Sequence, residues 1–173
     1  WIRLFHSRFT REDRRKIERD VVTRLGRPTE DGSAHADRPV RGIVVATQVV
    51  EQSIDIDFDL LVTDVAPIDL LLQRAGRMHR HGQDRPVRHC APRMIIFLPD
   101  RSVPGSGSNP YGSTGYIYFP FVLDRTVKEL ESLSGGVIRV PADVAQLVDA
   151  VYAEELQDTE KEKLWGEMLG EEQ

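Results

Sequence analysis

"FDLLVTDVAPIDLLLQRAGRMHRHG", residues 58–82, reads as a hydrophobic strand followed directly by an amphipathic helix. Its first nine residues are mostly apolar and β-branched, which is typical of a strand in the middle of a parallel sheet. Pro67 suits the first turn of a helix. At roughly 100° per residue, that helix would place Gln73, Arg77 and Arg80 in one narrow sector. We therefore expect a helix that continues through Arg80, with one buried face and one polar face.

Three further apolar runs, residues 1–5, 42–47 and 93–99, predict short strands along the chain. Thr10 is a suitable N-cap for a helix between the first two runs, and Gly26 is expected to end it. Strands that alternate with helices indicate right-handed crossovers and a parallel α/β sheet. In such sheets, ligand-binding groups gather at the carboxyl ends of the strands.

The composition changes beyond the last predicted strand. Residues 99–116 are dense in Pro, Gly and Ser, which sustain neither a helix nor a central strand. Helices are expected near residues 122–133 and from Pro141 to about Tyr152. The expected organisation is thus a sheet domain over residues 1–98, a linker over 99–116, and a helical region over 117–173.

Charge is distributed unevenly along the 173 residues, although the formal net charge is only −5. Residues 1–27 hold nine Lys and Arg against four Asp and Glu, whereas residues 150–173 hold eight Asp and Glu against two Lys. A basic half of this kind can attract a polyanion despite the acidic total. No apolar run is long enough to span a membrane, and the single Cys90 excludes an internal disulfide. We expect a cytoplasmic protein without a metal site.

Polar residues follow the predicted strand at 42–47. Thr47 and Gln48 would project a hydroxyl and an amide from the strand end, and Asp55 adds a carboxylate. A hydroxyl suits a phosphodiester oxygen and a carboxylate suits a ribose hydroxyl, so this loop could contact a nucleic acid and a nucleotide sugar. Gly76, with no side chain, would let a ligand or another backbone approach closely. Ordinary turn residues and a solvated basic face are the alternatives.

Three ordered segments resemble motifs IV, V and VI of superfamily 2 helicases: "LFHSRF" (4–9), "VATQVVEQSIDID" (45–57) and "QRAGRMHR" (73–80). More narrowly, they resemble the second RecA-like domain of the CRISPR-associated helicase-nuclease of type I systems. "VIRVPADVAQLVDAVY" (137–152) is similar to the C-terminal domain of the same family. The resemblance implies an incomplete RecA-like parallel sheet flanked by helices, followed by a small, mainly helical region.

The resemblance also implies roles at an ATP site. Arg77 and Arg80 match arginines that reach the γ-phosphate of ATP bound with Mg²⁺ by the other RecA-like domain. Gln73 matches a polar residue that helps to position them. Asp55 matches an acidic position near the ribose. Apart from the resemblance, we expect Gly76 beside the nucleotide because it lacks a side chain.

The same resemblance implies a path for single-stranded DNA. Ser7 and Arg8 of motif IV, together with Thr47 and Gln48 of motif V, match positions that line this path or couple it to the nucleotide. It assigns no role to Arg74, which we expect to matter less than Arg77. Single-stranded DNA and an RNA-guided CRISPR surveillance complex are the implied partners, with no membrane.

ATP hydrolysis and the family's nuclease need residue pairs that this sequence lacks. It contains no Gly-Lys, Asp-Glu or His-Asp dipeptide, so a phosphate loop, its Mg²⁺-holding partner and an HD nuclease are missing. We expect part of an ATP-dependent DNA translocase and nuclease that is inactive alone and leaves an apolar sheet face open. The alternatives are a non-enzymatic nucleic-acid or surveillance-complex binding module and a fragment of a superfamily 2 RNA helicase.

Overall fold

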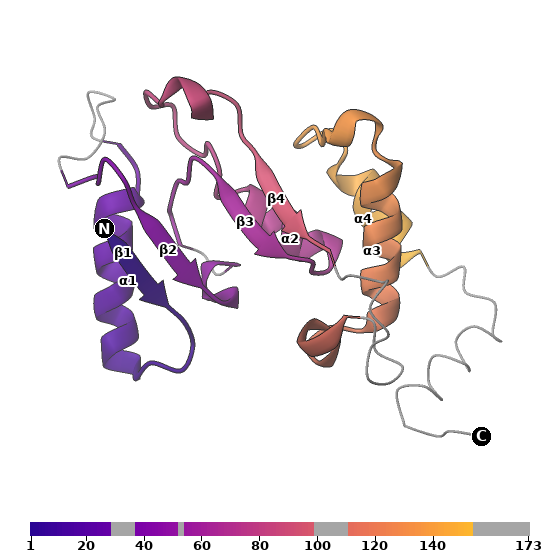
Figure 1. Cartoon of the computed structure of the whole chain (residues 1–173), viewed down its shortest axis with the longest axis horizontal. Helices are drawn as coiled ribbons and strands as arrows, with labels where there is room; N and C mark the ends of the chain where they lie inside the picture. The colour runs from indigo at the N-terminus through magenta and orange to yellow at the C-terminus, as the bar shows by residue number, and fades with distance from the viewer. Residues whose placement is uncertain (29–36, 52–53, 99–110, 154–173) are drawn as a thin grey trace. The chain divides into compact units, whose positions relative to one another are not determined.

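The computed structural model describes residues 1–28, 37–51, 54–98 and 111–153 (Figure 1). The strands in these ranges are β1 (Ile2–Phe5), β2 (Ile43–Ala46), β3 (Leu61–Asp64) and β4 (Met94–Phe97). The α-helices are α1 (Arg11–Leu25), α2 (Ile68–Ala75), α3 (Pro120–Ser132) and α4 (Val144–Tyr152). Short 3₁₀ helices are η1 (Gln48–Glu51), η2 (Val87–His89), η3 (Gly112–Tyr116) and η4 (Ser134–Gly136). The predicted α/β class is confirmed.

The strands pair in parallel, as predicted. β1 and β2 are in register from Ile2 opposite Ile43 to Phe5 opposite Ala46. The β3–β4 pair is also parallel, because residue numbers rise in the same direction along both strands. The N–H of Leu61 donates to the carbonyl of Arg93 (3.2 Å), and the N–H of Val65 donates to the carbonyl of Phe97 (3.1 Å). Among the described residues, the strands form two separate pairs rather than one sheet.

Helix α1 has the ends that the sequence predicted. The Thr10 side chain accepts a hydrogen bond from the N–H of Asp13 (3.2 Å) and caps the helix. The N–H of Gly26 donates to the carbonyl of Val22 (2.8 Å) at the other end. A Cβ added at Gly26 would lie 2.3 Å from that carbonyl oxygen, so this turn requires a residue without a side chain.

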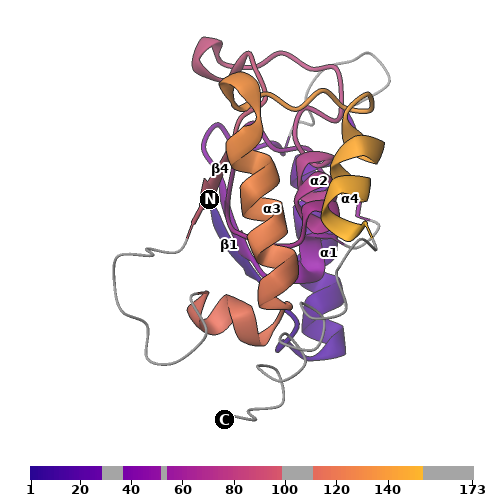
Figure 2. The same cartoon turned by 90° about the vertical axis from the view of Figure 1, so that its right-hand side faces the viewer.

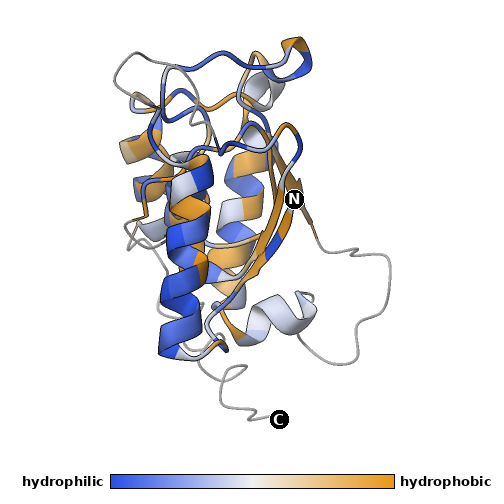
Figure 3. Ribbon diagram, turned by 90° about the vertical axis from the view of Figure 1, so that its left-hand side faces the viewer, coloured by the Kyte–Doolittle hydropathy of each residue, from blue (hydrophilic) through white to orange (hydrophobic). Residues whose placement is uncertain are grey.

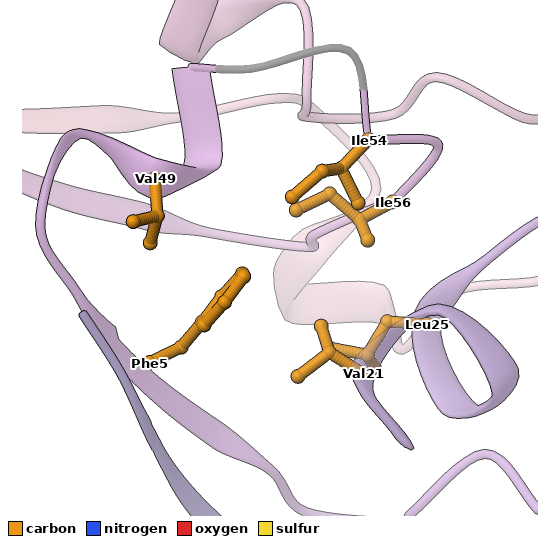
Figure 4. Close-up of a cluster of buried hydrophobic side chains, with 6 residues drawn as sticks. All are labelled: Phe5, Val21, Leu25, Val49, Ile54 and Ile56. Atoms are coloured by element: carbon orange, nitrogen blue, oxygen red, sulfur yellow. The ribbon is translucent and has the colours of Figure 1, made fainter. Parts of the chain in front are cut away.

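A hydrophobic core joins α1 to the β1–β2 pair, and Figure 4 shows its six buried side chains. They are Phe5, Val21, Leu25, Val49, Ile54 and Ile56. In Figure 3, α1 is mainly hydrophilic along the side that faces the viewer, whereas the strands drawn to its right are mainly hydrophobic. Large apolar side chains of β1 and β2, among them Ile2, Ile43 and Val45, remain more than half exposed. The open apolar face expected from the sequence is therefore present.

Helix α2 is shorter than predicted, and the expectation of a helix through Arg80 is wrong. The helix ends at Ala75, after which the next main-chain hydrogen bonds reach back three residues instead of four. Met78 then forms a parallel bridge with Phe58, and His79 has a positive φ of 47°. Main-chain pairing with Phe58, which precedes β3, has replaced helical hydrogen bonding, a competition that helical periodicity in the sequence does not reveal.

The chain divides into two compact units, and the second contains α3 and α4. Unit 1 comprises residues 1–62 and 73–95, and unit 2 comprises residues 63–72 and the described residues from 96 onward. The linker expected at 99–116 lies largely outside the described residues, as does the chain after residue 153. The boundaries expected at residues 98 and 116 therefore stay predictions.

Within unit 2, α3 and α4 lie side by side (Figure 2). Pro120 occupies the first turn of α3, close to the predicted start. α4 begins at Val144, later than expected, because the residues from Pro141 form a turn first. In that turn the N–H of Arg139 donates to the Asp143 carboxylate (2.7 Å).

Candidate functional site

Four predicted nucleic-acid-binding residues gather at one edge of the β1–β2 pair. Ser7 and Arg8 follow the end of β1, while Thr47 and Gln48 follow the end of β2. The N–H of Thr47 donates to the carbonyl of Phe5 (3.3 Å), which extends the strand pairing to this edge. All four residues are exposed. The structure thus brings together two segments that are far apart in the sequence.

The turn that presents Ser7 and Arg8 is held by aromatic residues. The N–H of Arg8 donates to Nδ1 of His6 (3.0 Å), and the His6 ring stacks on Phe9 with centroids 4.4 Å apart. A hydroxyl and a guanidinium on an ordered turn can contact successive phosphates of a strand.

The predicted phosphate-contacting arginines lie in residues 77–81, which follow the turn at the end of α2 and which we call the arginine segment. The N–H of Phe58 donates to the carbonyl of Arg77 (2.8 Å), and the N–H of His79 donates to the carbonyl of Phe58 (3.2 Å). These bonds tie the segment to the chain that leads into β3. Arg77 and Arg80 are therefore positioned by this pairing and not by the geometry of a helix.

Arg77 is held against the main chain of η1. Its Nε donates to the carbonyl of Val50 (3.2 Å), and its Nη2 lies 3.4 Å from the carbonyl of Glu51. Burial and the nearby charge of Arg80 lower the pKa of Arg77, and Asp55 opposes this shift. Two guanidiniums that repel each other favour an anion between them, because the anion would offset their repulsion.

Arg80 pairs with Asp55, the residue expected near the ribose. The Nε of Arg80 lies 2.9 Å from the Asp55 carboxylate, and both side chains remain partly exposed. The Nε2 of His81 also lies 2.9 Å from the same carboxylate oxygen. The proposed sugar and phosphate contacts thus share one ion-paired cluster. Sequence reasoning assigned no role to His81, whose pairing with Asp55 becomes clear only in the structure.

Gln73 and Gly76 lie close to the arginine segment in sequence but outside it. Gln73 is exposed on the last turn of α2. Gly76 occupies the turn after the helix, where its carbonyl lies 3.5 Å from Nη1 of Arg80. Since the helix ends before Arg77, Gln73 does not share a helical face with the arginines. Its role in positioning them stays a prediction.

Arg74 has a partner that the sequence did not reveal. Its Nε and Nη2 donate to Oε1 of Glu51 at 2.8 and 2.5 Å, and the two side chains are only 12% and 10% exposed. This buried pair links α2 to η1. The carbonyl groups of the same 3₁₀ helix accept hydrogen bonds from the Arg77 side chain. Arg74 is therefore a structural residue beside the site and not an inert part of a solvated face.

Asp57 and Arg85 form a second buried pair that sequence reasoning missed. Their side chains are 0% and 7% exposed, and they lie 2.6 Å apart. The sequence did contain a signal for a buried carboxylate, since Asp57 lies between two apolar residues in the "SIDIDFD" run, just before a predicted strand. The residue that would neutralise it could not be identified from spacing, because Arg85 lies beyond α2 in the chain.

The described residues hold neither a cluster of metal ligands nor a helix that could span a membrane. They contain no group of three or more His, Cys, Asp or Glu side chains that could hold a metal. Nor is any helix in the described part of the chain long and apolar enough to cross a membrane.

Known sequences resemble most of this chain. Residues 1–83 match the family model described as CRISPR-associated nuclease/helicase Cas3, C-terminal. The chain is 40% identical over 152 residues to the Cas3 endonuclease/helicase of Thermus thermophilus, covering 86% of this chain and 15% of that protein. It is 42% identical over 153 residues to the Escherichia coli protein of the same name, covering 87% of this chain and 16% of that protein.

Solved structures agree with the sequence matches. The crystal structure of T. fusca Cas3 superposes with a TM-score of 0.79 at 36% identity, over 98% of this chain and 18% of that one. A chain in a structure described as a CRISPR RNA-guided surveillance complex, pre-nicking, matches with a TM-score of 0.72 at 32% identity, over 98% of this chain and 20% of that one. The chain, which spans less than a fifth of the T. fusca protein, belongs to the Cas3 family of CRISPR-associated nuclease/helicases.

Proposed function

We propose that this chain forms part of an ATP-dependent single-stranded DNA translocase with nuclease activity that acts in CRISPR interference and antiviral defence. The observation that carries the proposal is the cluster of Arg77, Arg80 and Asp55. Two neighbouring guanidiniums, one of them with a pKa lowered by burial and by the other's charge, lie beside a partly exposed carboxylate. A nucleoside triphosphate offers anionic oxygens for the arginines and ribose hydroxyls for the carboxylate.

In this proposal, Arg77 and Arg80 stabilise the charge that develops on the γ-phosphate as it is transferred to water. A planar guanidinium can donate to two phosphoryl oxygens at once, which a lysine ammonium does not match. ATP with its Mg²⁺ would be held by a first RecA-like domain that this chain does not supply. We therefore expect no ATPase activity from the 173-residue chain by itself.

The exposed edge that carries Ser7, Arg8, Thr47 and Gln48 is the proposed contact for the DNA strand. It follows β1 and β2, and residues after β2 continue into η1, whose carbonyls hold Arg77. A change at the DNA edge can thus reach the arginine segment through one short 3₁₀ helix. An RNA-guided surveillance complex is the proposed protein partner, which the similarity to a chain in such an assembly supports.

The test is steady-state ATPase of the full-length protein that contains this chain, measured without nucleic acid, with single-stranded DNA and with RNA. DNA-stimulated turnover supports the proposal, whereas RNA-stimulated turnover favours an RNA helicase. Binding of DNA or of the surveillance complex without any turnover favours a non-enzymatic module.

Variants of the same protein test the arginines. An arginine finger in GTPases contributes about 10³–10⁵ in rate, and since two arginines share the task here, we expect Arg77→Ala or Arg80→Ala to lower kcat at least about a hundredfold. The KM for ATP should change much less, as expected for contacts made in the transition state. Lysine at either position should rescue poorly. Arg88→Ala, at an exposed arginine of η2, is the control. Near-normal turnover in both Arg77 and Arg80 variants would contradict the proposed role.

A further inference from the structure

Asp57 is a buried carboxylate whose hydrogen-bonding capacity is well used. It accepts from the N–H of Arg80 (3.1 Å), the N–H of His81 (3.4 Å), Nε2 of Gln83 (2.6 Å) and Nη2 of Arg85 (2.6 Å). A carboxylate has about four acceptor positions. An ionised group with no exposed surface persists only when its charge is paired and its oxygens are bonded, and both conditions hold for Asp57.

Arg85 completes the other half of this arrangement. Besides Asp57, its guanidinium contacts the Asp59 carboxylate, the carbonyl of His81 (3.2 Å) and the carbonyl of Phe58 (3.5 Å). The planar fork of an arginine suits several acceptors in fixed directions. The Arg85 side chain therefore connects Phe58 and Asp59, which precede β3, to the carbonyl of His81 in the arginine segment.

Together, Asp57 and Arg85 hold the main chain of the arginine segment from both sides. The Asp57 carboxylate accepts hydrogen bonds from the main-chain N–H groups of Arg80 and His81, and the Arg85 guanidinium donates to the carbonyl of His81. α2 has already ended before this point, so helical hydrogen bonds do not fix the direction of the segment. A buried ion pair adds little net stability over an apolar pair of similar volume, but it specifies one arrangement of the groups bonded to it.

We infer that the Asp57–Arg85 pair is a positioning device that sets Arg80 in its phosphate-contacting geometry beside Arg77. This inference rests on the proposed ATPase function. Asp57 has no exposed surface and Arg85 almost none, so neither touches the nucleotide. They act through the main chain at Arg80 and His81. A misplacement of about 1 Å in such a group can lower a rate about a hundredfold without removing any contact with the substrate.

The experiment compares Asp57→Asn and Arg85→Lys with Asp20→Asn in the full-length protein. Asp20 belongs to the same unit and accepts from two arginines, Arg3 and Arg24, so its substitution is the same chemical change at a separate ion pair that does not bond to the arginine segment. We measure kcat and KM for ATP with saturating single-stranded DNA, together with thermal unfolding. Asp57→Asn should lower kcat about tenfold to a hundredfold while KM changes less than about threefold. Arg85→Lys should show a smaller loss with the same split, and Asp20→Asn should keep its kcat.

Each outcome decides the inference. A folded Asp57→Asn protein whose kcat equals that of Asp20→Asn overturns it, as does a loss that appears only in KM. If Asp57→Asn does not fold, the milder Gln83→Ala variant, which removes one donor to Asp57, decides. A reduced kcat with unchanged KM then supports the inference, and an unchanged kcat overturns it. Absence of DNA-stimulated ATPase in the unsubstituted protein refutes the proposed function and this inference with it, whereas an active protein with unaffected variants refutes the inference alone.

Discussion

Replacing Arg74 by alanine should destabilise unit 1 substantially, because it leaves the Glu51 carboxylate buried without its ion-pair partner. Breaking a buried pair costs about 3–5 kcal/mol. Since about a tenth of each side chain stays exposed, water can partly solvate the remaining charge, so we expect the lower end of this range, about 3 kcal/mol. For a chain of this size, that corresponds to a fall of roughly 6–12 °C in the unfolding temperature.

The assay is urea unfolding followed by the fluorescence of Trp1 in a Trp165→Phe background. The Trp1 ring lies within 5.8 and 5.6 Å of the guanidinium carbons of Arg3 and Arg24, which belong to unit 1, so its emission should report the unfolding of this unit.

The matched control is the double variant Glu51→Leu, Arg74→Met. It removes both charges and should recover most of the lost stability, because an apolar pair of similar volume replaces a buried ion pair at little cost. A loss below about 1 kcal/mol for Arg74→Ala would refute the reasoning, since that is the range of an exposed ion pair. Equal losses in the single and double variants would also refute it.

Two further predictions concern the close approach at Gly26 and the raised pKa of Tyr152. Gly26→Ala should destabilise the protein by about 1–3 kcal/mol, because its Cβ would lie 2.3 Å from the Val22 carbonyl oxygen. Gly82→Ala, with no atom within 4 Å of the added Cβ, should be nearly neutral in the same unfolding measurement. Burial and the hydrogen bond to Asp69 raise the pKa of Tyr152 above its usual 10.0. A raised pKa adds stability that is complete below pH 10 and is lost as pH rises through the folded-state value, so the unsubstituted protein should lose stability faster above pH 10 than Tyr152→Phe. Parallel pH curves would contradict this.

The sequence by itself determined the ends of α1, because these ends depend on residues that are close together along the chain. Thr10 and Gly26 mark the ends of α1 because a cap and a close backbone approach act within one helical turn. The apolar runs marked the strands, and their parallel order placed Thr47 and Arg8 at one edge. Three ordered motifs also indicated the Cas3 family, which the comparisons confirm.

Only the tertiary structure decided how the arginine segment is held. Periodicity predicted one helix carrying Gln73, Arg77 and Arg80, but a helical pattern cannot show that the main chain of Phe58 competes for the hydrogen bonds of residues 77–79. The partners of Asp57 were equally hidden. A buried charge must be neutralised, yet the neutralising group is chosen by proximity in space, and Arg85 reaches Asp57 only after the chain has passed through β3 and α2. Local energies set the ends of α1, whereas contacts between segments far apart in the sequence set the end of α2 and the partner of Asp57.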